Sequence, residues 1–261
     1  METDAIFVET SSTPMPTTSA QLGRYVVVNA DDFGLSQGVN AGILHAHLHG
    51  IVTSASLMVR QPFASHAAEA QGRCPLLGLG LHLDLGEWRC TNGCWEPIYQ
   101  RVCLDDISAV RHEIAEQLEL FESLVGRAPT HVDSHQHVHK EEPVRSIVQE
   151  IFGDLQIPIR HQTARIRYCG EFYAQAGTGE PLPELISPAG LCRLLSRLAP
   201  GLTEVACHPG FDDELPSAYA VERRREVEAL CNDEVRASID AGGILLTSFG
   251  EVRKFLFPKP L

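Results

Sequence analysis

The stretch YVVVNADDFG, residues 25–34, joins a short apolar run to two adjacent carboxylates. Residues 25–30 are rich in β-branched side chains, which is the pattern of a buried strand. Asp31 and Asp32 follow this run directly, and Gly34 allows the backbone conformations that a sharp turn needs. The stretch therefore predicts a buried strand that ends in two acidic side chains.

Short apolar runs alternate with amphipathic stretches along the rest of the chain. Helices are predicted over residues 39–49, 107–125 and 220–241. Strands that alternate with helices favour a parallel sheet. The predicted fold is a single α/β domain of mostly parallel strands, either a distorted or incomplete (β/α) barrel or an open doubly wound sheet. The further runs that predict strands cover residues 53–59, 77–83, 130–133, 157–160, 203–207 and 243–247.

The helix over residues 107–125 has the clearest pattern. Asp105 or Asp106 can cap its start, and Gly126 with Pro129 ends it. Its apolar side chains advance by three or four positions and predict one buried face, made of Ile107, Val110, Ile114, Leu118, Phe121 and Val125.

The length of 261 residues suits one domain with a sizeable core, and no break in composition marks a second domain. Residues 1–23 contain a segment rich in Ser, Thr and Pro and predict a flexible tail, so the domain covers residues 24–261. The tail has no signal-peptide pattern, and no apolar segment is long enough to span a membrane. We therefore expect a cytoplasmic protein without an integral membrane segment.

The formal net charge of −13 and the lack of a basic run argue against a nucleic-acid partner. Cys90 and Cys94 lie close together, but no second pair completes a structural zinc site, so they are predicted to be reduced loop cysteines. Whether the chain forms homo-oligomers stays open at this point.

Polar side chains follow the predicted strands at the point where each strand ends. The carboxyl ends of parallel strands meet on one rim, where ligands bind. Imidazoles and carboxylates gathered in one small volume suit a divalent metal such as zinc, manganese, iron, nickel or cobalt. The side chains at these ends are Asp31, Asp32, His82, Asp133, His135, Arg160, His208 and Ser248.

Each of these signals also has a structural interpretation. Asp31 and Asp32 could cap the helix that follows them. His82 could be a hydrogen-bonded core residue, and His208 could belong to an ordinary loop. A shared site is the better interpretation, because four separate strand ends each finish in Asp or His. The remaining histidines outside the tract discussed next are predicted to be structural, and they are His45, His47, His49, His66, His112 and His161.

The tract HVDSHQHVH, residues 131–139, places four histidines and an aspartate at alternate positions. A strand would point all five side chains to one face. The predicted strand ends within the tract, however, so His137 and His139 fall beyond it. His131 lies early in the strand and is predicted to pack or to support the site. The tract therefore supplies one metal ligand, His135.

Five motifs in this order resemble the YdjC-like carbohydrate deacetylases, a family that includes chitooligosaccharide deacetylases and enzymes associated with hopanoid biosynthesis. The resemblance covers about residues 24–249. It implies a distorted (β/α) barrel and metal-dependent removal of N-acetyl groups from acetylated amino sugars. The motifs are VNADDFGLS at 28–36, GIVTS at 50–54, GLH at 80–82, PTHVDSHQHVH at 129–139 and CHP at 207–209.

The resemblance also implies roles for individual residues. Asp32, His82 and His135 would bind the metal, Asp31 would be the general base, and His208 would be the general acid. Swapped roles for the two aspartates stay open. Both can serve one site only if the backbone leaves regular strand geometry between them. The family's metal is often described as magnesium, whereas two imidazole ligands favour zinc or another transition metal.

The predicted function is hydrolysis of an N-acetylated amino sugar or oligosaccharide, with release of acetate. The alternatives are a metal-dependent phosphoesterase or sugar isomerase, and a sugar-binding protein with a decayed site. Residues 86–104 and 168–190 predict excursions over the site, in which Trp88 and Trp95 could stack on sugar rings or cover the barrel. Arg160 could orient the general base or a substrate group, or lie exposed on the surface.

Overall fold

The computed structural model describes residues 23–91, 94–176, 180–211 and 219–257. The predicted N-terminal tail lies outside these residues, apart from Gly23. Within the described residues, no helix combines the length and the apolar character needed to cross a membrane.

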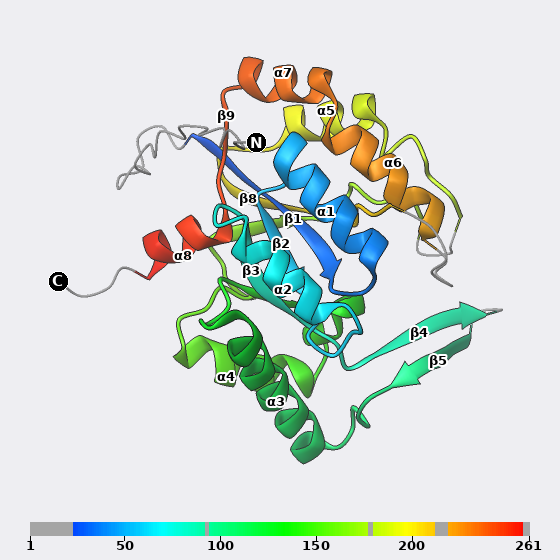
Figure 1. The fold of residues 1–261 in the computed structure, drawn as a ribbon, viewed down its shortest axis with the longest axis vertical. Helices are drawn as coiled ribbons and strands as arrows, with labels where there is room; N and C mark the ends of the chain where they lie inside the picture. The colour runs from blue at the N-terminus through cyan, green and yellow to red at the C-terminus, as the bar shows by residue number, and fades with distance from the viewer. Residues whose placement is uncertain (1–22, 92–93, 177–179, 212–218, 258–261) are drawn as a thin grey trace, which may run out of the picture.

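The strands form a parallel seven-stranded sheet and a separate antiparallel hairpin (Figure 1). The hairpin consists of β4 (Gly86–Thr91) and β5 (Cys94–Gln100). The order in the large sheet is β6-β3-β2-β1-β8-β7, and β9 pairs with β1. Its strands are β1 (Arg24–Phe33), β2 (Ser54–Leu57), β3 (Gly78–Leu83), β6 (Val132–Ser134), β7 (Ile166–Cys169), β8 (Gly201–Cys207) and β9 (Ile244–Leu246).

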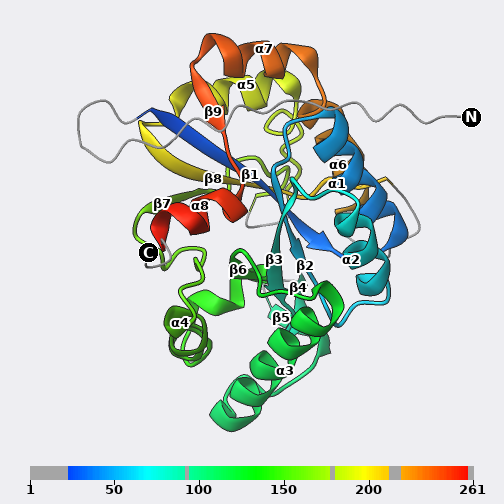
Figure 2. The same cartoon turned by 60° about the vertical axis from the view of Figure 1, so that its left-hand side comes forward.

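Helices surround the sheet, and Figure 2 shows α1, α2 and α6 on one side of it with α8 on the other. A 3₁₀ helix, η1 (His135–Lys140), follows β6 directly. The α-helices are α1 (Gln37–His49), α2 (Ala64–Gly72), α3 (Ile107–Val125), α4 (Val144–Asp154), α5 (Pro188–Arg197), α6 (Ala220–Leu230), α7 (Asp233–Ala241) and α8 (Phe249–Leu256).

The sequence GLGLHL of β3 shows how the two faces of the sheet differ. Its leucines lie in the main hydrophobic core. Gly78, Gly80 and His82 alternate with the leucines and therefore point to the opposite, inner face. A Cβ atom at Gly80 would lie 2.4 Å from the ring of His131. Glycine at this position lets a buried imidazole lie directly against the strand.

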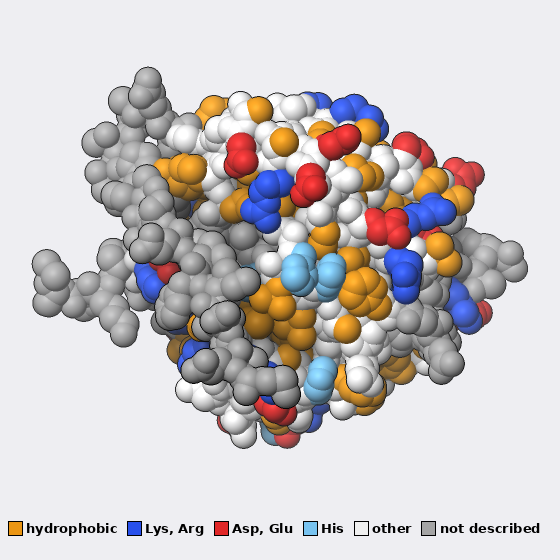
Figure 3. Space-filling model, turned by 45° about the horizontal axis from the view of Figure 1, so that its top comes forward, with side chains coloured by type: hydrophobic (Ala, Val, Ile, Leu, Met, Phe, Trp, Pro, Cys, Tyr) orange, Lys and Arg blue, Asp and Glu red, His pale blue; other side chains and the backbone are white. Residues whose placement is uncertain are grey.

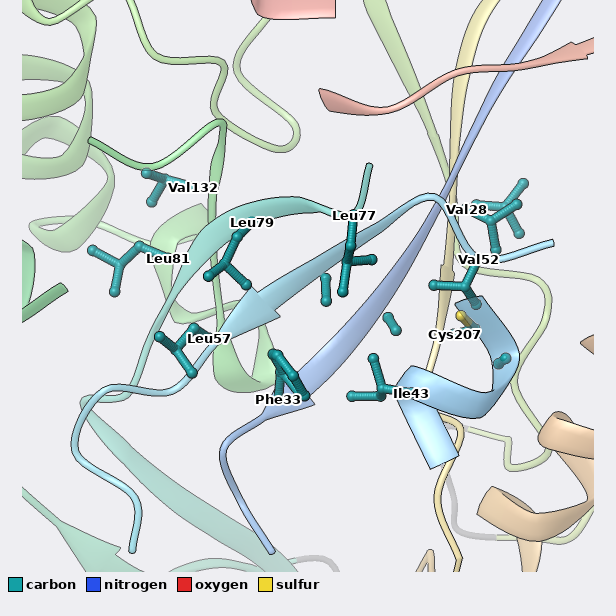
Figure 4. Close-up of a cluster of buried hydrophobic side chains, with 14 of the residues drawn as sticks. Val28, Phe33, Ile43, Val52, Leu57, Leu77, Leu79, Leu81, Val132 and Cys207 are labelled. Atoms are coloured by element: carbon teal, nitrogen blue, oxygen red, sulfur yellow. The ribbon is translucent and has the colours of Figure 1, made fainter. Parts of the chain in front are cut away.

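The outer face of the sheet packs against the helices (Figure 4). Val28 of β1 and Leu57 of β2 are fully buried there, together with Ile43 of α1. Figure 3, which brings the top of the Figure 1 view forward, shows acidic and basic side chains interspersed with hydrophobic ones over the described part of the molecular surface on that side. Burial of apolar side chains between sheet and helices stabilises the fold by about 25 cal/mol for each Å² removed from water.

The inner face of the sheet is apolar at one end and polar at the other. Tyr25 and Val27 of β1 pack with Phe249 of α8. The next inward side chains along β1, Asn29 and Asp31, are polar and buried. Helix α8 thus covers the amino-terminal end of the inner face, and the polar side chains gather at the carboxyl end.

The sheet curls into an incomplete (β/α) barrel. Beyond β6 it continues only through an isolated bridge between Val132 and Ile159, and β7 forms the other edge by pairing with β8. Residues 160–165 connect these two edges without a strand of their own. The α/β class and the incomplete barrel predicted from the sequence are confirmed, and the sheet is not the open doubly wound alternative.

Several predicted elements differ from those observed. The single helix predicted over residues 220–241 is two helices, because the Asn232 side chain accepts a hydrogen bond from the backbone of Glu234 and starts α7 there. The strand predicted over residues 157–160 is reduced to the bridge at Ile159, and β7 was not predicted.

The first predicted excursion, residues 86–104, contains the β4–β5 hairpin. Cys90 and Cys94 therefore lie on strands, which corrects their assignment to a loop; the Cys94 thiol is free, and the side chains of Cys90 and Trp95 lie outside the description. The second excursion, residues 168–190, begins in β7 and ends in α5, with 177–179 outside the described residues.

Candidate functional site

The end of β1 departs from regular strand geometry at its two aspartates. The register against β2 shifts between Ala30 and Phe33, and Asp32 adopts a left-handed backbone conformation with φ 68°. This conformation is unfavourable for a residue with a Cβ atom and is found at sites where the surrounding structure enforces it. As expected from the sequence, the break lets Asp31 and Asp32 face the same polar cluster.

Asp32, His82 and His135 meet at the carboxyl end of the barrel. The Oδ1 atom of Asp32 lies 3.4 Å from Nε2 of His82 and 3.1 Å from Nδ1 of His135. One donor atom from each of the three side chains falls within 4.8 Å of the others. A single divalent ion can therefore contact all three residues.

Two further contacts orient this group. The Nδ1 atom of His82 lies 2.7 Å from Oδ1 of buried Asp133, which leaves Nε2 facing Asp32. The guanidinium of Arg223, on α6, donates to Oδ2 of Asp32 at 2.6 Å and leaves Oδ1 facing the two imidazoles. A carboxylate that fixes the tautomer of a ligating histidine is a regular feature of metal sites.

The charges of these carboxylates raise the histidine pKa values. Burial would lower the pKa of His82, but Asp133 and Asp32 outweigh it and raise the pKa to about 10. Burial is likewise outweighed at His135, where the hydrogen-bonded Asp32 and the nearby carboxylate of Glu87 raise the pKa to about 9. A cluster that binds protons this strongly has excess negative charge, which also attracts a metal cation.

Arg160 holds the neighbouring carboxylate, Asp31. Its Nη1 and Nη2 atoms donate to the two oxygens of Asp31 at 2.6 and 2.7 Å, and Nη2 also contacts Asp133 and Glu204 at 2.7 and 2.6 Å. Burial would raise the pKa of Asp31, but the guanidinium outweighs it and lowers the pKa. Arg160 is only 4% exposed, so the surface interpretation of this residue was wrong.

A second group of donors, Asp31, His82 and Asp133, is also compact enough to hold an ion. Both of its carboxylates are already paired with Arg160, however. A cation in that group would compete with a buried guanidinium for the same oxygens. The group containing Asp32 and His135 is therefore the better metal site.

His208 lies beyond the end of β8 and faces Asp31. Its Nε2 atom is 3.9 Å from Oδ2 of Asp31, and its ring meets Tyr173 and Tyr219 edge-on. Its backbone N–H donates to the buried carboxylate of Glu226, which fixes the position of the segment. Burial lowers the pKa of His208 to about 4, so the imidazole is neutral at pH 7.

The rest of the histidine tract serves the structure. His131 is 1% exposed and stacks on Phe249 with ring centroids 3.9 Å apart, which confirms a packing role. His137 and His139 lie in η1, after the strand has ended, as predicted. Ser248, at the end of the last predicted strand, instead caps α8.

Sequence reasoning did not find Arg223, Glu204 or Glu226. Arg223 lies in the run ERRRE, which has the composition of a solvent-exposed helix face. Only its place on the inner side of α6, where it is 5% exposed, distinguishes it from the exposed Arg224 and Arg225. Glu204, on β8, carried a usable signal, because a charged residue inside an apolar strand is rarely buried without a partner.

Comparisons with known proteins find deacetylases that match this chain over nearly their full length. The chain is 35% identical over 253 residues to a carbohydrate deacetylase of Geobacillus stearothermophilus, covering 88% of this chain and 99% of that protein. It is 33% identical over 259 residues to a chitooligosaccharide deacetylase of Klebsiella pneumoniae, with the same coverage.

Solved structures share the fold. A protein of Enterococcus faecalis, whose suggested activity is cellobiose-phosphate cleavage, superimposes with a TM-score of 0.71 at 26% identity, over 88% of this chain and 99% of that one. A family 4 carbohydrate esterase of Streptomyces lividans, 12% identical, matches 87% of this chain and 93% of its own with a TM-score of 0.52, which supports the barrel architecture alone. Residues 25–241 match the sequence profile of the YdjC-like proteins, and the chain belongs to this family.

Proposed function

We propose that this protein is a metal-dependent carbohydrate deacetylase that hydrolyses the N-acetyl group of an amino sugar or oligosaccharide and releases acetate. The observation that carries the proposal is the meeting of Asp32, His82 and His135 beside Asp31, which Arg160 keeps ionised. The similar proteins named carbohydrate and chitooligosaccharide deacetylases support the substrate class.

The proposed metal ligands are Asp32, His82 and His135. Two imidazoles and one carboxylate are a ligand set that zinc and other transition metals prefer, whereas magnesium prefers oxygen ligands. We therefore infer a transition metal as the resident ion. When bound, such an ion would polarise the acyl carbonyl group and lower the pKa of the attacking water.

Asp31 is the proposed general base. It is ionised at neutral pH because Arg160 outweighs its burial, and its Oδ2 atom, which accepts from Arg160, also lies 3.9 Å from Nε2 of His208. It can therefore accept the proton of a water molecule that attacks the acetyl carbon. Asp32 is the poorer candidate for this role, because its Oδ1 atom faces both imidazoles of the proposed metal site and would bind the ion there.

His208 is the proposed general acid. The leaving amine needs a proton, but a histidine with a pKa of about 4 is neutral at the start of the cycle. It must first receive a proton, and protonated Asp31 is an adjacent source. The proton of the attacking water would thus pass through Asp31 and His208 to the amine, and both residues would return to their starting states.

The proposal is tested by elemental analysis of the purified protein, followed by an acetate-release assay on N-acetylated mono- and oligosaccharides. Asp31→Asn should lower kcat by about 10²-fold or more, because it removes general-base catalysis, and should leave the metal content unchanged. Asp154→Asn, at an exposed position on α4, is the matched control. Full activity of Asp31→Asn would exclude this residue as the base.

The same assay separates the rival functions. A phosphoesterase would release phosphate from sugar phosphates, and a decayed site would bind N-acetylated sugars without turnover at any metal supplement. Either result would contradict the deacetylase proposal and favour the corresponding rival function. A cytoplasmic location and the oligomeric state remain predictions, to be examined by fractionation and by sedimentation of the purified protein.

A further inference from the structure

The β4–β5 hairpin begins close to the site and extends away from the barrel (Figure 1). Its base is attached to Asp84, a fully buried residue two positions after His82. The hydroxyl of Tyr99 donates to Oδ1 of Asp84 at 2.9 Å, and Arg101 contacts Oδ2 at 2.6 Å. The direction in which the hairpin leaves the barrel is therefore set by the residue that directly follows β3, the strand that carries the proposed metal ligand His82.

A second attachment joins the hairpin to the loop that carries His135. The side-chain amide of Gln136 pairs with the backbone of Trp88, accepting from its N–H at 2.9 Å and donating to its carbonyl at 2.8 Å. Gln136 and the next residue, His137, both have left-handed backbones, with φ 51° and 56°. Neither is glycine, so the surrounding contacts must hold this strained conformation in place.

The hairpin also places a carboxylate opposite His135. Oε2 of Glu87 lies 3.8 Å from Nε2 of His135, while Nδ1 of the same ring faces Asp32. This Nε2 atom is buried and has no hydrogen-bond partner within the described residues. His82 is arranged in the same way, with one ring nitrogen toward Asp32 and the other toward Asp133. The carboxylate that supports His82, Asp133, thus belongs to the barrel, whereas the one that faces His135, Glu87, belongs to the hairpin.

We propose that the hairpin is a part of the metal site, with Glu87 and Gln136 as positioning residues that orient His135 as a ligand. Gln136 docks the hairpin, and Glu87 then accepts from Nε2 of His135, which keeps Nδ1 available for the metal. Metal affinity and hairpin docking are consequently coupled, and the coupling is reciprocal. The inference rests on the metal site of the proposed function.

The metal dissociation constant tests the proposal without any activity assay. Zn²⁺ alone is titrated into chelator-treated protein, and its Kd is measured by competition with a chromophoric chelator. Glu87→Ala should raise the Kd by about 10-fold or more, because the loss of a carboxylate that supports a ligating histidine has this effect. Gln136→Ala should raise it in the same direction. Glu96→Ala and Gln100→Ala, at exposed positions on β5, are the matched controls and should keep the wild-type Kd.

A double-variant comparison separates the proposed coupling from two independent effects. Gln136→Ala removes the attachment at Trp88 and so loosens the hold on Glu87 at His135, although the attachment at Asp84 remains. Adding Glu87→Ala in that background should therefore change the Kd less than it does in the wild type. Hydrogen exchange supplies an independent readout. Zn²⁺ should slow exchange of the Trp88 amide in the wild type, and this effect should be lost in Gln136→Ala.

The outcomes also distinguish this inference from the proposed function. Wild-type Zn²⁺ binding with an unchanged Kd in Glu87→Ala and Gln136→Ala would overturn the role of the hairpin and leave the deacetylase proposal standing. Equal effects of Glu87→Ala in both backgrounds would overturn the coupling. Absence of Zn²⁺ binding by the wild type would overturn the metal site, and both proposals would be rejected together.

Discussion

Two adjacent aspartates acquire different properties because each is paired with its own arginine. Burial would raise the pKa of Asp31 and Asp32, but Arg160 lowers the pKa of the first and Arg223 lowers that of the second. Arg160 holds both oxygens of its partner, whereas Arg223 holds only one. This difference fits the proposed roles, in which Asp31 is an anchored base and Asp32 binds the metal through the oxygen that faces the two imidazoles.

Metal uptake is expected to release protons. His82 and His135 have pKa values of about 10 and about 9, so both imidazoles are charged at pH 7 in the metal-free protein. Ligation requires the neutral imidazole, so Zn²⁺ binding should release about two protons, and its affinity should rise with pH up to about 9–10. Calorimetric titration in two buffers with different ionisation heats measures this number.

The raised pKa values of His82 and His135 also make the stability of the folded protein depend on pH. In the metal-free protein the two protonated histidines stabilise the folded state below pH 6.5, and this contribution is lost as the pH rises through about 9 and 10.

The control for the proton-release measurement is His112→Gln, on the exposed part of α3, which should leave proton release unchanged. Release of much less than one proton on Zn²⁺ binding would contradict the assignment of the two ligands.

At the scale of single residues, the sequence identified the polar side chains that follow buried strands. Asp32, His82 and His135 could be found because strand ends converge in a parallel sheet. Arg223 could not be found, because its role depends on which side of α6 faces the site. Local composition does not contain that information.

At the scale of elements, helix α3 shows both the strength and the limit of periodicity. Its bounds agree with the prediction, and Asp106 caps it through the backbone N–H of Ala109. Ile107 was predicted to be buried but is 56% exposed, because the first turn extends beyond the core. Gln117 is buried instead, since its side chain bonds the backbone of Asp84.

Two substitutions in α3 should therefore differ strongly. Phe121 is fully buried, so Phe121→Ala should lower the free energy of unfolding by about 3–5 kcal/mol. Ile107→Ala removes exposed atoms and should change it by no more than about 0.5 kcal/mol. Urea unfolding of both variants gives the two values. Similar losses of unfolding free energy in the two variants would mean that the helix is packed along the whole of its predicted buried face.

Short elements were harder to predict than α3. Strand β7 has four residues, none of them fully buried, so it presents neither an apolar run nor a clear alternation. The break between α6 and α7 did have a signal, because Asn232 followed by Asp233 and Glu234 is typical of a helix start. The amphipathic pattern that continues across the break hid this signal.

At the scale of the whole molecule, the domain is predicted to need only residues from about 23 onward. Strand β1 begins at Arg24, the carbonyl of Gly23 accepts from the backbone of Gly201, and the family match begins at residue 25. A chain that starts at Gly23 should therefore keep the unfolding midpoint and the Zn²⁺ affinity of the full chain. Thermal unfolding and zinc titration of the shortened protein test this; a marked loss of either would assign residues 1–22 a structural role.

The proposed metal site also connects parts of the barrel that are distant in sequence. Asp32 ends β1, His82 lies on β3, and His135 begins η1 after β6. An ion that binds these residues only in the folded chain should stabilise the whole molecule by about 2.7 kcal/mol at 100 times its Kd. For a domain of this size, the melting temperature should then rise by about 5–10 °C. Calorimetry of the chelator-treated protein with and without Zn²⁺ measures the shift.

His135→Gln removes one proposed ligand and should lose most of the Zn²⁺-dependent rise in melting temperature, whereas His112→Gln should retain this rise. A shift that persists in His135→Gln would mean that zinc stabilises the fold from another place.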